Sequence, residues 1–345
     1  MKRFQEGDKM TATIKDVAKR ANVGVGTVSR VINNHPSVSD EIRKRVLQAI
    51  EELDYKPNAI ARSLKIKSTK TIGVIIPDIS SAFYPEIVRG IEDAAKDLSY
   101  NIILLNTDLK REKEKEALNM LKEKKADGIL FISNTVNKNL KREFKKTGIP
   151  VVLVSTKDLE GEIPSVTIDN ERAAFDITNY LIKMGHRKIA IISGPKDDPN
   201  AGITRLEGYK RALLESGISV DENLIFYGNY KFKSGYDAMQ KILMLKERPT
   251  AIFAASDTMA VGAASCAMQK GFNIPEDFSI VGFDGVELAE YFYPPITTVK
   301  QPRYEMGSKG MQLLIDILRG ETKQKSVVLD YEIIERKSCR EMGGI

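Results

Sequence analysis

A chain of 345 residues, 42% hydrophobic and 29% charged, has the composition of an ordinary globular protein of two or three domains. Its longest apolar runs are only strand-sized, and its N-terminal sequence lacks the apolar core and cleavage pattern of a secretory signal, so we expect neither a membrane-spanning nor an exported protein. Two cysteines and two histidines predict neither a disulfide framework nor a metal site, so we expect a cytoplasmic protein without a metal.

The positive charge is concentrated at the start of the chain. Residues 1–70 hold 15 Lys and Arg against 8 Asp and Glu, whereas the rest of the chain holds 38 against 39. This division predicts a module that binds a polyanion, joined to a nearly neutral body.

Three short helices are predicted in residues 11–57. Thr13-Ile14-Lys15-Asp16 is a capping box that opens the first helix, a turn at residues 22–24 leads into the second, and Ser39 precedes the third. Each helix has an apolar face at helical spacing, formed by Ile14, Val17, Ala18 and Ala21, by Val28, Val31 and Ile32, and by Ile42, Val46, Ala49, Ile50 and Leu53. The pattern is typical of a helix-turn-helix domain.

The outward face of the second helix has small residues where a solvated helix would carry Glu and Lys. It consists of Val25, Gly26, Ser29, Arg30 and Asn33. Small residues at the first turn let a helix approach the DNA major groove closely, whereas a plain three-helix bundle with a poor helix start is the alternative interpretation.

Three segments together resemble the LacI family of bacterial transcription regulators: "TIKDVAKRANVGVGTVSRVIN", "YKPNAIARSLKIKSTKTIGVIIPD" and "VGFDGVELAEYFYPPITTVKQPRYEMG". The resemblance extends from Thr11 to about Lys337. It implies that residues 58–70 contain a hinge helix and linker, in which Leu64 inserts into the minor groove, although a simple linker helix also fits the periodicity. The candidate DNA-binding residues are Thr13, Val25, Gly26, Thr27, Ser29, Arg30, Asn33, Asn58 and Leu64.

From residue 71 onward, strands and amphipathic helices alternate, which predicts parallel sheets covered on both faces. The predicted strands are 71–76, 101–105, 127–132, 150–154, 188–193, 250–255, 278–283 and 296–300. Eight strands are too many for one small doubly wound unit. The family resemblance implies a periplasmic-binding-protein-like clamp of two doubly wound parallel-sheet subdomains, one from about 71–168 and 301–329, the other from about 169–298 and 330–337.

No pattern of a catalytic site is present. "GVGTVS" lacks the third glycine of a dinucleotide-binding loop and follows a helix rather than a strand. We therefore expect binding rather than catalysis, without a cofactor.

A ligand of an open α/β sheet binds at the carboxyl ends of its strands. Planar rings combined with Arg and Asp suit a sugar, which stacks on rings and forms paired hydrogen bonds. The candidate effector-binding residues at these ends are Phe83, Tyr84, Asp169, Arg205, Tyr230, Ser256, Asp257 and Asp284. For three of them a structural role is the alternative: Asp284 as a turn cap, Asp257 as a helix N-cap and Phe83 as a core residue.

The chain is thus interpreted as a cytoplasmic homodimeric repressor of carbohydrate-utilisation genes, which binds a pseudo-palindromic operator under the control of a sugar-type effector. Its body is also similar to the catabolite control protein A subgroup, which implies serine-phosphorylated HPr as an alternative partner. However, Glu305 and Gln312 stand where that subgroup has Asp and Arg. A solute-binding protein is a further alternative, against which the basic N-terminal module argues.

Overall fold

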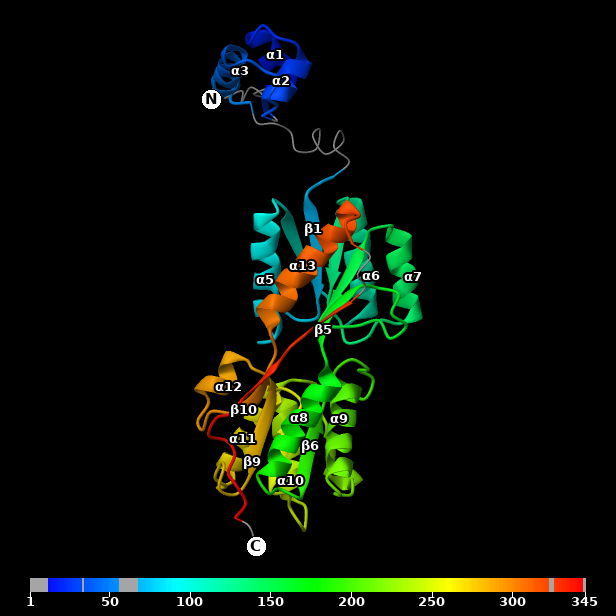
Figure 1. The fold of residues 1–345 in the computed structure, drawn as a ribbon, viewed down its shortest axis with the longest axis vertical. Helices are drawn as coiled ribbons and strands as arrows, with labels where there is room; N and C mark the ends of the chain where they lie inside the picture. The colour runs from blue at the N-terminus through cyan, green and yellow to red at the C-terminus, as the bar shows by residue number, and fades with distance from the viewer. Residues whose placement is uncertain (1–11, 33, 56–67, 323–325, 344–345) are drawn as a thin grey trace, which may run out of the picture. The chain divides into compact units, whose positions relative to one another are not determined.

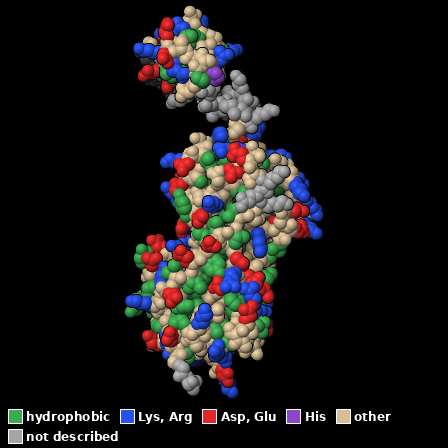
Figure 2. Space-filling model, viewed as in Figure 1, with side chains coloured by type: hydrophobic (Ala, Val, Ile, Leu, Met, Phe, Trp, Pro, Cys, Tyr) green, Lys and Arg blue, Asp and Glu red, His purple; other side chains and the backbone are tan. Residues whose placement is uncertain are grey.

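The computed structural model describes residues 12–32, 34–55, 68–322 and 326–343 (Figure 1). The chain divides into two compact units, residues 1–69 and residues 70–345. Figure 2 shows acidic and basic side chains interspersed over the visible face of the second unit, in keeping with its near-neutral charge.

The described part of the first unit forms three helices, α1 (Ile14–Arg20), α2 (Val25–Ile32) and α3 (Asp40–Glu52). The predicted inward positions form one small core, since Val17, Val28, Val31 and Val46 are all buried together. In the turn between α1 and α2 it is Asn22, with φ of 50°, that adopts the left-handed conformation. Asparagine tolerates this conformation because its short side chain can bond locally, so no glycine is required at the turn.

The second unit contains two subdomains, each built on one sheet. The first subdomain has the strand order β11-β5-β4-β3-β1-β2, all parallel. Its strands are β1 (Thr71–Ile76), β2 (Asn101–Asn106), β3 (Gly128–Phe131), β4 (Val151–Val154), β5 (Ser165–Ile168) and β11 (Ser326–Leu329). Its helices are α5 (Tyr84–Asp97), α6 (Arg111–Glu123), α7 (Lys138–Thr147) and α13 (Arg303–Arg319).

The second subdomain has the order β12-β10-β9-β8-β6-β7, in which only the pairing of β12 with β10 is antiparallel among the described strands. Its strands are β6 (Ile189–Ser193), β7 (Ile225–Tyr227), β8 (Ala251–Ala254), β9 (Ser279–Asp284), β10 (Thr297–Lys300) and β12 (Glu332–Ile334). Its helices are α8 (Asn170–Lys183), α9 (Gly202–Glu215), a 3-10 helix at Glu222–Leu224, α10 (Phe232–Leu243), α11 (Asp257–Gln269) and α12 (Glu287–Tyr291). The two sheets confirm the predicted fold class.

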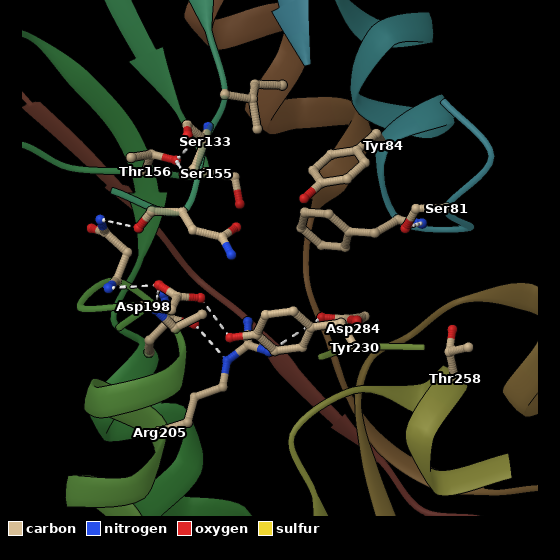
Figure 3. Close-up of a pocket in the computed structure, with 16 residues that line it drawn as sticks. Ser81, Tyr84, Ser133, Ser155, Thr156, Asp198, Arg205, Tyr230, Thr258 and Asp284 are labelled. Carbon is tan, nitrogen blue, oxygen red and sulfur yellow. Dashed lines mark hydrogen bonds and ion pairs between the residues drawn. The ribbon is translucent and has the colours of Figure 1, made fainter. Parts of the chain in front are cut away.

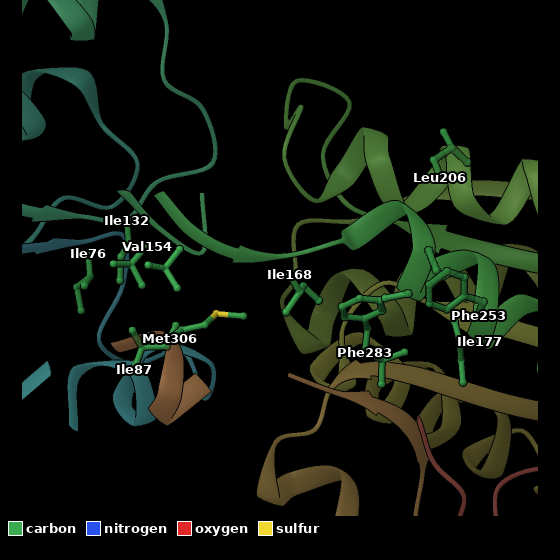
Figure 4. Packing of buried hydrophobic residues seen from close by; sticks show 14 of the residues in the cluster. Ile76, Ile87, Ile132, Val154, Ile168, Ile177, Leu206, Phe253, Phe283 and Met306 are labelled. Carbon is green, nitrogen blue, oxygen red and sulfur yellow. The ribbon is translucent and has the colours of Figure 1, made fainter. Parts of the chain in front are cut away.

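Both faces of the first sheet are covered, which explains why β1 is an unbroken apolar run. Ile72, Val74 and Ile76 belong to a core cluster that includes Ile87 of α5 and Met306 of α13. Ile75, on the opposite face, packs with residues of α6 and α7. In Figure 4 Ile76, Ile87, Ile132, Val154 and Met306 form one group, and Ile168, Ile177, Leu206, Phe253 and Phe283 form a second. Successive side chains of a strand point to opposite faces of the sheet. A parallel strand that is buried on both faces is therefore expected to be apolar throughout.

Helices α5 and α13 approach each other very closely. A Cβ atom at Gly90 of α5 would lie 2.1 Å from the carbonyl oxygen of Tyr304, and one at Gly307 of α13 would lie 2.0 Å from that of Ile87. Glycine is required at these two positions because any side chain would separate the helices.

The chain passes between the subdomains three times, after Ile168, after Lys300 and after Leu329. As a result α13 and β11 belong to the first subdomain, although they follow nearly all of the second in sequence. These three segments are the covalent connections across which the subdomains are positioned.

All eight predicted strands are present, with ends within one residue of those predicted. The prediction missed β5, β7, β11 and β12. These strands are short, and the alternating exposure of β11 at the edge of its sheet leaves it without an apolar run.

Candidate functional site

A cleft lies between the two subdomains, at the carboxyl ends of their strands (Figure 3). The first subdomain contributes loops that follow β1, β3 and β4: Ser81, Phe83, Tyr84, Ile132, Ser133, Asn134, Ser155 and Thr156. The second contributes helix starts and strand ends: Asn170, Asp198, Asn200, Ala201, Arg205, Tyr230, Thr258 and Asp284. Five of the predicted effector-binding residues, Phe83, Tyr84, Arg205, Tyr230 and Asp284, are thereby brought to one cavity.

Arg205 is buried at the floor of the cleft and is held by four groups. Its Nη1 donates to the carbonyl oxygen of Ala255 at 2.7 Å, and its Nε donates to Oδ1 of Asn170 at 2.9 Å. The same Nη1 lies 3.6 Å from Oδ1 of Asp284, and the guanidinium carbon lies 3.6 Å from the ring centroid of Phe283. Hydrogen bonds and ring stacking together fix the orientation of this guanidinium.

Asp284 ends β9 in an unusual backbone conformation. Its φ is 117°, which is rare for any residue other than glycine. Oδ1 accepts a hydrogen bond from Nε2 of Gln301 at 2.8 Å. Burial raises the pKa of this carboxyl above its usual value, whereas the charges of Arg205 and Arg303 act in the opposite direction.

Aromatic side chains from both subdomains face the cleft. The rings of Phe83 and Tyr84 meet edge to face, with centroids 5.3 Å apart. Across the cleft the hydroxyl of Tyr230 donates to Oδ2 of Asp198 at 2.6 Å. Burial and the neighbouring carboxylate of Asp198 raise the pKa of Tyr230 well above its usual value, so the phenol stays protonated. The arrangement gives the cleft flat apolar surfaces bordered by hydrogen-bonding groups.

Three predicted effector-binding residues do not line the cleft. Asp169 is the N-cap of α8, and Oδ1 accepts from the backbone N–H of Arg172 at 2.9 Å. Ser256 is the N-cap of α11, and its hydroxyl accepts from the N–H of Met259 at 3.2 Å. Each of these two residues thus has one side-chain oxygen engaged in helix capping.

Asp257 is the third, and it is fully buried behind the cleft. Its carboxylate accepts from the N–H of Val286 at 2.8 Å and from the hydroxyl of Thr298 at 2.5 Å. Burial and the charge of Asp284 both raise its pKa. Asp257 therefore joins α11 to the adjoining strands instead of facing a ligand, and the next residue, Thr258, lines the cleft in its place.

Asp198 and Asn200 are not among the predicted effector-binding residues, although both follow the carboxyl end of β6 and line the cleft. The Asn200 side chain bridges the subdomains: Nδ2 donates to the carbonyl oxygen of Asn134 at 3.0 Å, and Oδ1 accepts from the N–H of Lys157 at 2.9 Å. The loops after β3 and β4, which carry Asn134 and Ser155, could have been included by the same rule of strand ends.

Arg303, at the start of α13, also links the subdomains. Its guanidinium donates to the carbonyl oxygens of Ala82 at 3.3 Å and Gly285 at 3.1 Å, and it pairs with Glu86 at 2.5 Å. Its buried Nε has no hydrogen-bond partner among the described residues. Ala82 and Glu86 belong to the first subdomain and Gly285 to the second, so one side chain bonds to both.

The first unit exposes the predicted DNA-facing surface of α2. A Cβ atom added at Gly24 or Gly26 would meet nothing within 4 Å, so the fold itself does not require glycine there. Val25 is 42% exposed, and Arg30 is exposed as well. Thr27 and Ser29 are half-buried beside them. An open surface of small residues beside one Arg permits the close approach of another macromolecule.

Thr13 lies at the start of α1, where its N–H and its hydroxyl both donate to Oδ2 of Asp16, at 2.8 and 2.6 Å. Hydrogen bonding to Thr13 lowers the pKa of this carboxyl. The candidate DNA-binding residues Asn33, Asn58 and Leu64 lie outside the described residues.

Within the described residues, no helix has the length and apolar character needed to cross a bilayer. Two sequence families match the chain. "Bacterial regulatory proteins, lacI family" matches residues 13–58, and "Periplasmic binding proteins and sugar binding domain of LacI family" matches residues 69–337.

Individual relatives match along almost the whole chain. Catabolite control protein A of Priestia megaterium is 46% identical over 332 residues, which cover 96% of this chain and all of that protein. A complex of the transcriptional regulator CelR with cellobiose is 34% identical with a TM-score of 0.74, covering 95% of this chain and 99% of that one. The lac repressor dimer bound to operator and the anti-inducer ONPF is 26% identical with a TM-score of 0.86 and the same coverage.

Proposed function

The chain belongs to the LacI family of bacterial transcriptional regulators, and from this premise we propose how its surfaces bind DNA and a small effector. As a member of that family it is a DNA-binding transcriptional regulator. The proposed finer function is repression, in the cytoplasm, of carbohydrate-utilisation genes, with the affinity for the operator set by a sugar-type ligand in the cleft.

The open face of α2 supports the proposed DNA contact. Because Gly24 and Gly26 meet no protein atom where a side chain would lie, their small size serves contact with something outside the fold. We assign the major-groove contact to Val25, Gly26 and Arg30, with Thr27, Ser29 and Thr13 beside them.

The single observation that supports an effector most strongly is the cleft itself, whose two walls come from different subdomains. A ligand that contacts Tyr84 on one side and Tyr230 on the other favours one arrangement of the subdomains over others. Rings combined with hydroxyl and amide groups suit a sugar. The solved structure of CelR, a relative of similar fold, is a complex with cellobiose.

We propose a homodimer, supported by the palindromic character expected of the operator and by exposed apolar side chains on the second subdomain. Tyr291 and Tyr293 are 74% and 80% exposed, and Leu288 of α12 is exposed beside them in sequence. Exposed aromatic side chains favour contact with another protein copy. The lac repressor structure contains a dimer of similar chains.

Two measurements test the proposal. Operator fragments are selected from random duplex DNA by the purified protein, and their affinity is titrated against salt. In a plot of log affinity against log salt concentration, the slope should become more negative by about 0.9 for each DNA phosphate that the protein neutralises. A slope near zero contradicts DNA binding by the basic first unit. Thermal-shift screening of mono- and disaccharides should then find a ligand that raises the melting temperature and changes operator affinity.

The second candidate function is a catabolite control protein A-type regulator that responds to serine-phosphorylated HPr. The 46% identity to that protein over its whole length favours this alternative. Glu305 and Gln312 on the exposed side of α13 argue against it, because neither offers the bidentate hydrogen bonds that Arg gives to phosphate. Saturable binding of phosphorylated but not of unmodified HPr, with no response to any sugar, would establish the alternative.

A further inference from the structure

The charged groups of the cleft are already engaged. Among the described residues that line it, three carry charge: Asp198, Arg205 and Asp284. The guanidinium of Arg205 bonds to Ala255 and Asn170 within the protein and lies beside the Asp284 carboxylate. The one cation of the lining is therefore balanced before any ligand enters.

Asp198 has no comparable partner. Its Oδ1 accepts from the N–H groups of Asn200 and Ala201, both at 3.0 Å, and its Oδ2 accepts from the Tyr230 hydroxyl. All three donors are uncharged, and no described Lys or Arg lies within ion-pair distance of this carboxylate. With Arg205 and Asp284 balancing each other, Asp198 leaves the cleft with excess negative charge.

At the cleft, three helix N-termini of the second subdomain each donate at least one hydrogen bond to a side-chain oxygen of the protein. Asn170, Ala201 and Thr258 bring the starts of α8, α9 and α11 to the lining. In α8 the N–H of Arg172 donates to Asp169, and in α11 the N–H of Met259 donates to Ser256. At α9 the Asp198 carboxylate occupies the position that an anionic ligand would take at a helix start.

Two cations that adjoin residues of the cleft are paired with carboxylates. Arg303 pairs with Glu86, and Lys231 lies 3.6 Å from Asp78. Neither Arg303 nor Lys231 belongs to the lining residues.

The groups that remain for a ligand are all uncharged. The hydroxyls of Tyr84, Ser155 and Thr258 and the side-chain amide of Asn134 line the cleft without a hydrogen bond to another described residue. They come from both subdomains and present donors and acceptors suited to the hydroxyl groups of a polyol.

We propose that the cleft selects an uncharged sugar and rejects its phosphorylated form. This specificity rests on the proposed function of the cleft as an effector site. The Asp198 carboxylate repels a phosphate. Arg205, the one cation among the described lining residues, is already engaged and does not compensate for removing that phosphate from water.

The experiment uses the full-length protein and calorimetric titration with matched pairs: glucose and glucose 6-phosphate, trehalose and trehalose 6-phosphate, and further pairs of the same kind. For any pair of which a member binds, the uncharged sugar should bind at least about tenfold more tightly. A phosphorylated sugar that binds as tightly as its parent, or more tightly, overturns the charge inference but leaves a sugar effector standing. If no member of any pair binds, the sugar effector and the inference both fail.

Two variants with the same change in net charge locate the effect. Asp198→Asn keeps the shape of the side chain and should reduce the preference for the uncharged sugar several-fold. Asp197→Asn alters the adjacent exposed carboxylate, which does not line the cleft, and should leave the preference unchanged. Equal shifts in the two variants would show a general charge effect and overturn the assignment to Asp198.

Discussion

The Asn200 side chain of the second subdomain donates a hydrogen bond to the Asn134 backbone carbonyl of the first, at 3.0 Å. With the bond from Lys157 N–H to Oδ1, this buried amide holds the two subdomains together at one end of the cleft. Asn200→Ala should lower the free energy of unfolding of the second unit by about 1–3 kcal/mol, because it leaves buried backbone groups without a partner. Urea denaturation followed by fluorescence measures this change.

The control for Asn200 is Asn119→Ala on the exposed surface of α6, which should change stability by less than about 0.5 kcal/mol. Equal effects of the two substitutions would show that the bridge contributes nothing specific.

Gly26→Ala separates folding from DNA binding. The added methyl group meets no protein atom, and alanine favours a helix by about 0.5–1 kcal/mol over glycine. The variant should therefore melt at the same or a higher temperature, yet bind operator more weakly, because the methyl group stands between α2 and the groove. Gln48→Ala, at an exposed position of α3, is the matched substitution that should leave operator binding unchanged. Unaltered operator affinity of Gly26→Ala would remove Gly26 from the interface.

Arg205→Lys tests the proposed effector site while keeping the charge. Lysine cannot reach Ala255 and Asn170 at once and cannot stack on Phe283 as the planar guanidinium does. Affinity for the sugar that gives the largest thermal shift with wild-type protein should fall at least about tenfold, a loss of about 1.4 kcal/mol. Operator affinity without sugar should stay within about twofold of wild type. A wild-type response to that sugar contradicts the assignment of Arg205 to the site.

We predict that the free energy of unfolding decreases on acidification because of the buried His186. The imidazole is buried, with Nδ1 2.8 Å from the Thr250 hydroxyl and Nε2 3.2 Å from the Arg340 carbonyl oxygen, and burial lowers its pKa below the usual 6.5. The folded state therefore binds this proton more weakly than the unfolded state, so the stability contributed at neutral pH is lost as pH falls below about 6.5. The wild-type free energy of unfolding is measured from pH 7.5 to 5.

The same titration on His186→Gln should show a smaller loss over that range, because the titrating group is gone. His35→Gln, in the first unit, is the comparison that should keep the wild-type slope for the second unit. Identical slopes for wild type and His186→Gln would exclude a contribution from His186.

The parts predicted from the sequence are those that depend on local patterns. Apolar spacing was enough to predict three helices and eight strands, since burial on one or both faces is encoded in neighbouring residues. Strand β11 was missed because its pairing with β5 joins segments about 160 residues apart, through side chains that are alternately exposed. No local pattern reports such a pairing.

The candidate effector site also divides into residues that local patterns predict and residues whose roles depend on distant segments. Arg205 and Asp284 were found because each follows or ends a predicted strand. Ser256 and Asp257 were predicted as effector-binding residues, whereas Thr258 was not. The exact residue at which α11 begins determines that Ser256 caps the helix, Asp257 is buried and Thr258 lines the cleft. The bridging role of Asn200 depends on the other subdomain, which local sequence does not describe.

The triple crossing of the chain has a consequence for how this protein can be divided. A fragment that ends at Ile168 would contain β1 to β5 but lack both α13 and β11, because these return only after the second subdomain is complete. The apolar face that α13 covers would then be bare, and β5 would become an unpaired edge able to recruit strands from other molecules. Neither subdomain is a module that can be exchanged by cutting the gene at one point. The two have to be inherited, synthesised and folded as one piece.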